Sequence, residues 1–92
     1  MSHETGIAEP TRTAVTEWII RYATAALDMR REDFSTSAHF DSYGLDSAEV
    51  VIMAGLLEEA FGIEINPEQF FTTPSVDGVV EALVAAGTVR AD

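Results

Sequence analysis

The chain contains no cysteine, which excludes a disulfide, a thiolate metal site and a cysteine nucleophile. It also lacks lysine, so five arginines are the only basic side chains against sixteen aspartates and glutamates. The net charge of −11 repels nucleic acids and anionic lipid headgroups, because contacts to phosphates need the opposite sign. The same charge favours partners with basic surfaces and, through self-repulsion, a monomer.

Long hydrophobic runs are missing as well. No apolar stretch approaches the roughly 18 residues of a membrane span, and residues 1–6 lack the basic and apolar regions of a signal peptide. We therefore expect a protein of the cytoplasm without a membrane span. The 92 residues, 47% of them hydrophobic, give room for one small core. A deep, dry catalytic pocket is hard to build at this length, whereas binding and carrier modules are not.

Apolar residues recur at helical spacing in two segments of the N-terminal half. The first begins near Thr11, and Pro10 suits its first turn. Its expected core stripe is Val15, Trp18, Ile19, Tyr22, Ala26 and Met29. The second begins at Asp46-Ser47, two residue types that cap helices, and stops at Gly62. Its expected core face is Val50, Met53, Ala54, Leu57 and Phe61.

The rest of the chain completes a small bundle. One short helix is expected from Asn66 to Phe71, and a last helix from the start signal Thr73-Pro74 to Gly87, where Gly78 indicates a close helix–helix approach. The stripe of the last helix is Val76, Val79, Val80, Leu83 and Val84. We predict an all-α, four-helix bundle of three main helices and one short one. Its parts are a loose tail over 1–9, the folded domain over 10–87 and a C-terminal tail over 88–92.

The first two helices are joined by a long loop over residues 31–46, which lacks a helical period. A loop of this length in a compact domain is usually functional. Phe34, Phe40 and Tyr43 are expected to hold it against the core, so we predict an ordered loop.

Neither catalysis nor metal binding has a candidate site in this sequence. His3 and His39 stand at no spacing that suggests a general base beside a nucleophile. The acids Asp41, Asp46 and Glu49 do not follow the calcium-loop pattern. We therefore expect no catalytic residues and no metal, and the protein is not expected to be an enzyme.

The junction of the long loop and the second helix remains, and here the sequence resembles the acyl carrier protein family over about residues 12–87. The resemblance rests on four segments: Tyr43-Gly44-Leu45-Asp46-Ser47, the helix Ala48–Phe61, the link Gly62-Ile63-Glu64-Ile65 and the run Phe70-Phe71-Thr72-Thr73-Pro74-Ser75-Val76. In that family the serine of Gly-x-Asp-Ser accepts 4′-phosphopantetheine from coenzyme A. The resemblance thus implies that Ser47, preceded by Asp46, carries this cofactor and that the thiol of the arm holds acyl groups as thioesters.

The physical setting of Ser47 agrees with that role. A serine at a helix start lies near free N–H groups and the positive end of the helix dipole, which tolerate a phosphodiester. Gly44 allows a tight turn just before it. Without a base nearby, Ser47 needs a separate phosphopantetheinyl transferase. The alternative is that Ser47 is a plain N-cap serine.

The resemblance also implies that the second helix is the docking surface for the transferase and for acyl-loading and acyl-processing enzymes with basic surfaces. We expect its outward side to combine charge and apolar contact, with charges steering the encounter. The expected docking residues are Glu49, Val51, Ile52, Gly55, Glu58 and Glu59.

Three residues depart from the pattern of fatty-acid carriers: Ala48, Ile52 and Gly55 replace a larger aliphatic, an acid and a bulky apolar residue. They favour a freestanding carrier of a specialised lipid or polyketide pathway. Two alternatives stay open. One is a peptidyl carrier of a nonribosomal pathway, which usually has Gly-Gly before the motif and less acid. The other is an unmodified helical adaptor whose acidic face binds a basic partner.

Overall fold

The structure, a computed structural model, describes residues 9–92, so of the tail expected over residues 1–9 all but Glu9 lie outside the described residues. Four α-helices and two short 3-10 helices make up this part of the chain. Their bounds are α1 Arg12–Leu27, η1 Arg31–Asp33, η2 Phe40–Tyr43, α2 Ser47–Phe61, α3 Glu68–Thr72 and α4 Val76–Ala85. The predicted all-α bundle of three main helices and one short helix is confirmed.

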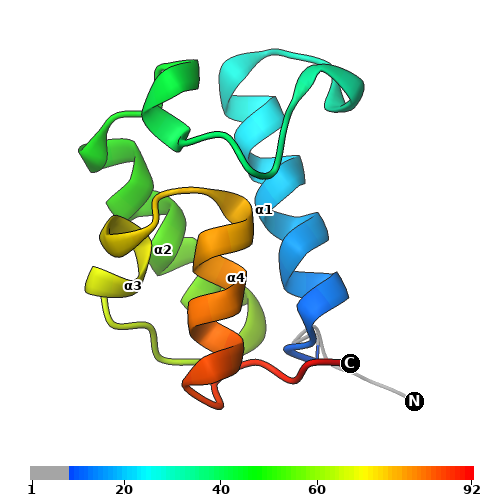
Figure 1. Cartoon of the computed structure of the whole chain (residues 1–92), viewed down its shortest axis with the longest axis vertical. Coiled ribbons are helices and arrows are strands. Elements are labelled where there is room, and N and C mark those ends of the chain that lie inside the picture. The colour runs from blue at the N-terminus through cyan, green and yellow to red at the C-terminus, as the bar shows by residue number, and fades with distance from the viewer. Residues whose placement is uncertain (1–8) are drawn as a thin grey trace.

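The helices surround one core, with α1 packed against α2 and α4, and the short α3 packed against α4 (Figure 1). The connection from α1 to α2 crosses one end of the bundle, and the start of α1 lies beside the C-terminal segment at the other. Within the described residues, no helix is long and apolar enough to cross a bilayer.

Three aromatic residues hold the long connection in place. Phe34 and Phe40 are buried, and the Tyr43 ring stacks on Phe34 with 4.9 Å between ring centres. The Tyr43 hydroxyl oxygen accepts a hydrogen bond from the Ser35 N–H at 2.7 Å. The predicted ordering of this loop is confirmed, and its two 3-10 turns were not foreseen.

Helix α1 begins at Arg12, two residues after the proline that was expected in its first turn. The Thr11 hydroxyl oxygen caps the helix by accepting from the Ala14 N–H at 3.1 Å, so Pro10 precedes the helix instead of occupying its first turn. At the other end Asp28 adopts the left-handed conformation (φ 53°) and stops the helix.

The buried face of α1 is rotated from the one expected. Its buried residues are Val15, Ile19, Ile20 and Ala23. Trp18 and Tyr22, expected in the core, are half-buried, and Ala26 is exposed. The two rings stack on each other at 5.6 Å between centres. Rings with polar N–H and O–H groups are readily placed at a core edge, where those groups keep a partner.

Helix α2 matches its prediction closely. It starts at Ser47, ends at Phe61 and is stopped by Gly62 in the left-handed conformation. Of the expected core face, Val50, Met53, Leu57 and Phe61 are buried and Ala54 is half-buried.

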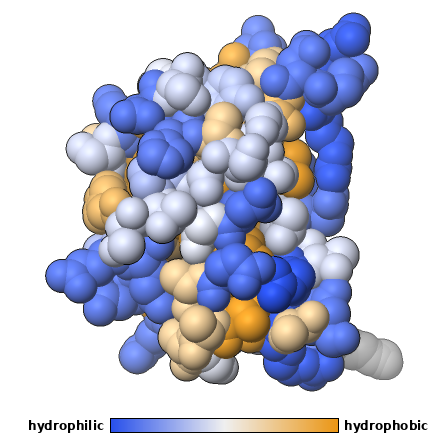
Figure 2. Space-filling view, viewed as in Figure 1, coloured by the Kyte–Doolittle hydropathy of each residue, from blue (hydrophilic) through white to orange (hydrophobic). Residues whose placement is uncertain are grey.

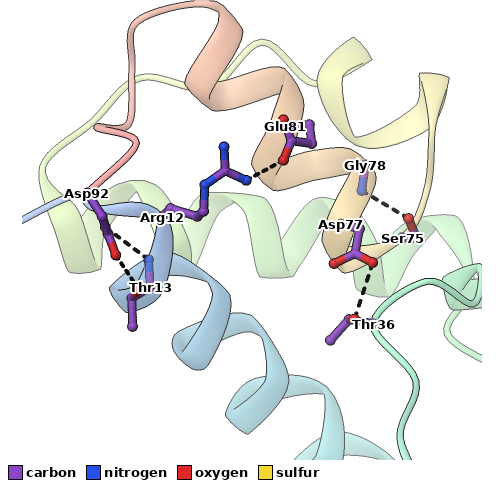
Figure 3. Close-up of polar contacts among 8 residues, drawn as sticks. All are labelled: Arg12, Thr13, Thr36, Ser75, Asp77, Gly78, Glu81 and Asp92. Carbon is purple, nitrogen blue, oxygen red and sulfur yellow. Dashed lines mark hydrogen bonds and ion pairs between the residues drawn. The ribbon is translucent and has the colours of Figure 1, made fainter.

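The start of α4 differs from the Thr73-Pro74 signal. Ser75 is the cap, because its hydroxyl oxygen accepts from the Gly78 N–H at 3.0 Å (Figure 3). A Cβ on Gly78 would overlap the side chain and carbonyl oxygen of Thr73. The close approach indicated by this glycine is therefore real, but the neighbour is the α3–α4 link and not another helix.

The C-terminal boundary also corrects the expectation, since residues 88–92 are not a separate tail. Val89 is 2% exposed, and the backbone of Arg90 pairs with the chain at the start of α1. Asp92 accepts hydrogen bonds from the hydroxyl and N–H of Thr13 (Figure 3). Burial of Val89 draws this segment onto the bundle, because its apolar surface leaves water there.

Polar contacts fasten α4 to the rest of the bundle. Arg12 of α1 pairs with Glu81 of α4, and the Thr36 hydroxyl in the long connection donates to the Asp77 carboxylate at 3.2 Å (Figure 3). The face drawn in Figure 2 is largely hydrophilic, with a hydrophobic patch in the lower part of the view.

Candidate functional site

Ser47 is the first residue of α2, and its side chain is exposed. The cap of this helix is its neighbour Asp46, whose carboxylate accepts from the Glu49 N–H at 2.9 Å. Within residues 9–92 no hydrogen bond engages the Ser47 hydroxyl. The interpretation of Ser47 as a plain N-cap serine is therefore wrong: capping belongs to Asp46, and the serine hydroxyl is available.

The residues just before Ser47 are held in place by buried residues of the α1–α2 connection. Gly44 ends η2 with φ 93°, a left-handed conformation that glycine adopts without strain. Leu45 is buried, and its N–H donates to the Phe40 carbonyl oxygen at 3.2 Å. Phe40 itself donates its N–H to the Pro74 carbonyl oxygen at 2.7 Å, so the loop before Ser47 is tied to the start of α4.

A largely apolar cavity of about 190 Å³ opens beside Ser47. Its lining is Phe40, Asp41, Leu45, Asp46, Ser47, Val50, Phe71 and Pro74. A second apolar groove of about 230 Å³ continues between α2 and α3 and shares Val50 and Phe71 with the first. A larger hollow of about 610 Å³ lies at the α2–α3 link, is lined mostly by polar residues and does not include Ser47.

Ser47 lies in open surroundings at the start of a helix. The hydroxyl is exposed at the positive end of a 15-residue helix, and Asp46 directs its carboxylate at the Glu49 N–H. Space is also open around Gly44, where an added Cβ would meet no atom within 4 Å.

The three glutamates expected on the docking surface have different surroundings. Glu49 is half-buried and accepts a hydrogen bond from the Tyr22 hydroxyl of α1. Glu58 is half-buried and accepts from the Ile65 N–H at 2.7 Å, which closes the link after α2. Glu59 alone is exposed without a hydrogen bond among the described residues. Two of the three glutamates that the sequence assigned to partner docking are thus hydrogen-bonded within the fold.

The contact between Tyr22 and Glu49 also changes the titration of the tyrosine. The hydrogen bond to the carboxylate, assisted by burial, raises the pKa of Tyr22 to about 12. A phenolate beside a carboxylate would place two negative charges together, so the protonated tyrosine is favoured.

The apolar residues that the sequence assigned to the docking surface are exposed. Val51 and Ile52 are each 54% exposed, and Gly55 between them on the surface is exposed with nothing within 4 Å of an added Cβ. Two further exposed hydrophobic residues were missed: Leu56 at 41% and Phe71 at 43%. Leu56 could have been found by its i, i+4 spacing from Ile52, whereas Phe71 had no signal to separate it from its buried neighbour Phe70.

Other titratable groups form no competing site. His39 is exposed and caps η2 through its backbone, while His3 lies outside the described residues. Across residues 9–92, no three side chains of His, Asp or Glu gather closely enough to hold a metal ion.

Comparison with known proteins agrees with this geometry. The family model described as the phosphopantetheine attachment site matches residues 17–83. The fold is similar to that of Asl1650, an acyl carrier protein from Anabaena sp. PCC 7120 with a variant phosphopantetheinylation-site sequence. The two share 28% identity over 94% of this chain and 98% of that one, with a TM-score of 0.76.

A second solved structure shares the fold at lower identity. It is a free-standing peptidyl carrier protein from an uncharacterized Acinetobacter baumannii secondary metabolic pathway, 23% identical over 85% of this chain and 98% of that one, with a TM-score of 0.72. The family model spans well over half of the sequence and includes the whole of α2. The chain therefore belongs to the acyl carrier protein family, whose members are non-catalytic carriers that hold phosphopantetheine.

Proposed function

We propose that Ser47 is the residue that receives 4′-phosphopantetheine and that the chain carries acyl groups for enzymes of a specialised lipid or polyketide pathway. The observation that supports this assignment is that Asp46 caps α2, while Ser47 is exposed and its hydroxyl makes no hydrogen bond among the described residues. When attached, the arm supplies a terminal thiol on which acyl groups travel as thioesters.

The chain itself contributes position and access, while the transfer chemistry belongs to other proteins. Asp46 and Gly44 hold Ser47 at the end of the bundle, facing solvent. No described histidine or other base contacts its hydroxyl, so a phosphopantetheinyl transferase must activate it. Attachment in the cytoplasm, as expected from the sequence, is part of this proposal.

The exposed side of α2 is proposed as the docking surface for partner enzymes. Val51, Ile52, Gly55 and Glu59 face solvent along this side, in the turns that follow Ser47. An enzyme that acts on the serine or on its attached arm must approach over these residues. Glu49 and Glu58, also expected here, border the surface but are hydrogen-bonded within the fold.

A specialised pathway is supported by the same surface. Ala48, Ile52 and Gly55 make this side of α2 apolar where fatty-acid carriers show larger or acidic residues. An acyl cargo is favoured over a peptidyl one because the chain has Leu45 in the position of the second glycine of Gly-Gly and carries −11. The Anabaena relative, named as an acyl carrier, is also the more identical of the two structures.

Intact-mass spectrometry tests the attachment. Incubation with coenzyme A, Mg²⁺ and a broad-specificity phosphopantetheinyl transferase is expected to add the mass of one phosphopantetheine. Ser47→Ala should abolish the gain, whereas Ser42→Ala, at another exposed serine, should keep it. An unchanged wild-type mass with a transferase active on a reference carrier would favour the unmodified adaptor and refute the carrier assignment.

A further inference from the structure

The first turn of α2, which carries Ser47, makes few contacts with the rest of the molecule. Ser47 and Ala48 are exposed, and Val50 is the first buried side chain of the helix. Glu49 is half-buried, and its carboxylate accepts a hydrogen bond from the Tyr22 hydroxyl of α1. Among the described residues, this is the one hydrogen bond that joins the first turn of α2 to another helix.

The Tyr22 side of this bond is held in place by α1. The Tyr22 ring is half-buried against the core and stacks on the Trp18 ring, with 5.6 Å between ring centres and 11° between ring planes. Ile19 and Ala23, which stand beside these rings on α1, are fully buried. A hydroxyl on a ring with so few free rotamers loses little entropy when it bonds, so it fixes the position of Glu49 relative to α1.

Glu49 is also engaged through its backbone. Its N–H donates to the Asp46 carboxylate at 2.9 Å, and the Val50 N–H donates to the Asp46 carbonyl oxygen at 3.0 Å. At 100° per residue, Ser47 and Glu49 stand about 200° apart around the helix, so their side chains point to different sides. A bond between Glu49 and α1 therefore sets the rotation of the first turn, and with it the direction of the Ser47 hydroxyl.

We propose that Tyr22 is a positioning residue for the transfer of phosphopantetheine. Its hydroxyl holds Glu49 against α1 and thereby keeps the first turn of α2 formed, with the Ser47 hydroxyl directed to solvent. This inference rests on the proposed attachment at Ser47. Placement of the accepting hydroxyl matters because a displacement of about 1 Å can lower a rate about 100-fold. Glu49 then acts from inside the fold, through the placement of Ser47, and not through the charge that it offers to a partner.

Single-turnover kinetics with the transferase in excess tests this placement, because it separates binding from the transfer step. Tyr22→Phe keeps the ring and removes only the hydroxyl. Its maximal rate of transfer should fall about fivefold, which corresponds to the loss of one ordinary hydrogen bond. The transferase concentration that gives the half-maximal rate should change less than about twofold, since the outward side of α2 is unaltered.

Two variants of Glu49 separate positioning from charge. Glu49→Ala removes the acceptor and should lower the maximal rate as much as Tyr22→Phe does. The double variant should fall no further, because both changes break the same bond. Glu49→Gln removes the charge but keeps an oxygen that accepts from Tyr22, so its rate should stay within about twofold of wild type. A Glu49 that acted by its charge would instead make Glu49→Gln resemble Glu49→Ala, with a raised half-saturating concentration.

Amide hydrogen exchange measures the first turn of α2 without the transferase. In Tyr22→Phe the N–H groups of Glu49 and Val50 should exchange about fivefold faster, while those in the last turn of α2 keep their wild-type rates. Thr24→Val is the matched control, because the Thr24 hydroxyl lies on the same helix but donates to the Ile20 carbonyl oxygen at 2.8 Å. Its loss should change neither the exchange in α2 nor the transfer.

The inference is overturned if folded Tyr22→Phe transfers at the wild-type rate, if the losses in Tyr22→Phe and Glu49→Ala multiply in the double variant, or if exchange in the first turn is unchanged. Circular dichroism checks folding, and Glu49→Ala carries both measurements if Tyr22→Phe unfolds. A wild-type chain that gains no phosphopantetheine by mass is recognised separately, as a failure of the Ser47 assignment. The exchange rates then still decide whether Tyr22 holds the turn.

Discussion

Two regions of the molecule differ in how their side chains are engaged. One is the region where α4 packs against α1 and against the long connection, and the other is the outward side of α2. In the first, side chains are paired within the molecule: Arg12 with Glu81 and Thr36 with Asp77 (Figure 3). The space beside Gly78 is filled as well, because an added Cβ there would overlap Thr73. On the second, Ile52 is half-exposed and has no such pairing. The two regions belong to one 92-residue chain and one core.

The contrast shows how a small carrier divides its residues between stability and recognition. A chain of this size buries only about 60–65% of its unfolded surface, so it depends on close packing wherever a partner is not needed. The outward side of α2 is free of that demand because the buried inner face of α2 supplies most of its packing. Val50, Met53, Leu57 and Phe61 provide this packing.

The largest expected effect separates the two faces of α2. Leu57 is fully buried, and Leu57→Ala should lower the free energy of unfolding by about 2–5 kcal/mol through lost contacts and a cavity. Ile52→Ala on the exposed side should cost less than about 1 kcal/mol. Urea denaturation of both variants measures the difference. A cost at Ile52 equal to that at Leu57 would mean that the outward side is part of the core.

Two glycines sharpen the contrast further, because the same substitution should act with opposite sign. Gly55→Ala adds a methyl group into open space and should stabilise the protein by about 0.5–1 kcal/mol through helix propensity. Gly78→Ala gains the same propensity but overlaps Thr73, and overpacking of this kind costs about 1–3 kcal/mol. Chemical denaturation of the two variants measures their free energies of unfolding. If both variants were more stable than wild type, the close contact at Gly78 would be refuted.

The smallest expected effect concerns the contact that joins α1 to the first turn of α2. The folded pKa of Tyr22, about 12, lies above its ordinary value of 10, so the stabilising contribution is full below pH 10. It is lost as the pH rises from 10 to about 12, because the unfolded chain releases this proton more readily. Wild type should therefore lose more thermal stability than Tyr22→Phe over this interval. Parallel losses in the two proteins would contradict the assigned bond.

Much of the fold was predictable because its signals are local. Asp46-Ser47 before an apolar period and Gly62 after it predicted the bounds of α2 closely. Caps were harder where two candidates stood close together: Thr11 displaced Pro10, and Ser75 displaced Thr73. In both caps the hydroxyl oxygen accepts a hydrogen bond from a free N–H three residues later. The order of residues alone does not tell which of two neighbouring candidates makes this bond.

In the candidate site, too, some features follow from the local sequence and others depend on contacts between distant segments. The exposed position of Ser47 follows from the helix start, since the first residue of a surface helix has few neighbours before it. The engagement of Glu49 by Tyr22 joins residues 27 apart in the chain, so no local pattern announces it. The buried face of α1, with Trp18 and Tyr22 at the core edge, depends in the same way on packing against α2 and α4.

By itself, then, the sequence determined the helices, the acidic charge and the exposed serine at the start of α2, because each arises from neighbouring residues or from composition. Only the tertiary structure decided that Val89 closes the core, that Glu49 and Glu58 are bonded inward, and that Leu56 and Phe71 extend the apolar surface. Those features depend on contacts between segments distant in sequence. Their energies are set by which surfaces meet once the helices have packed.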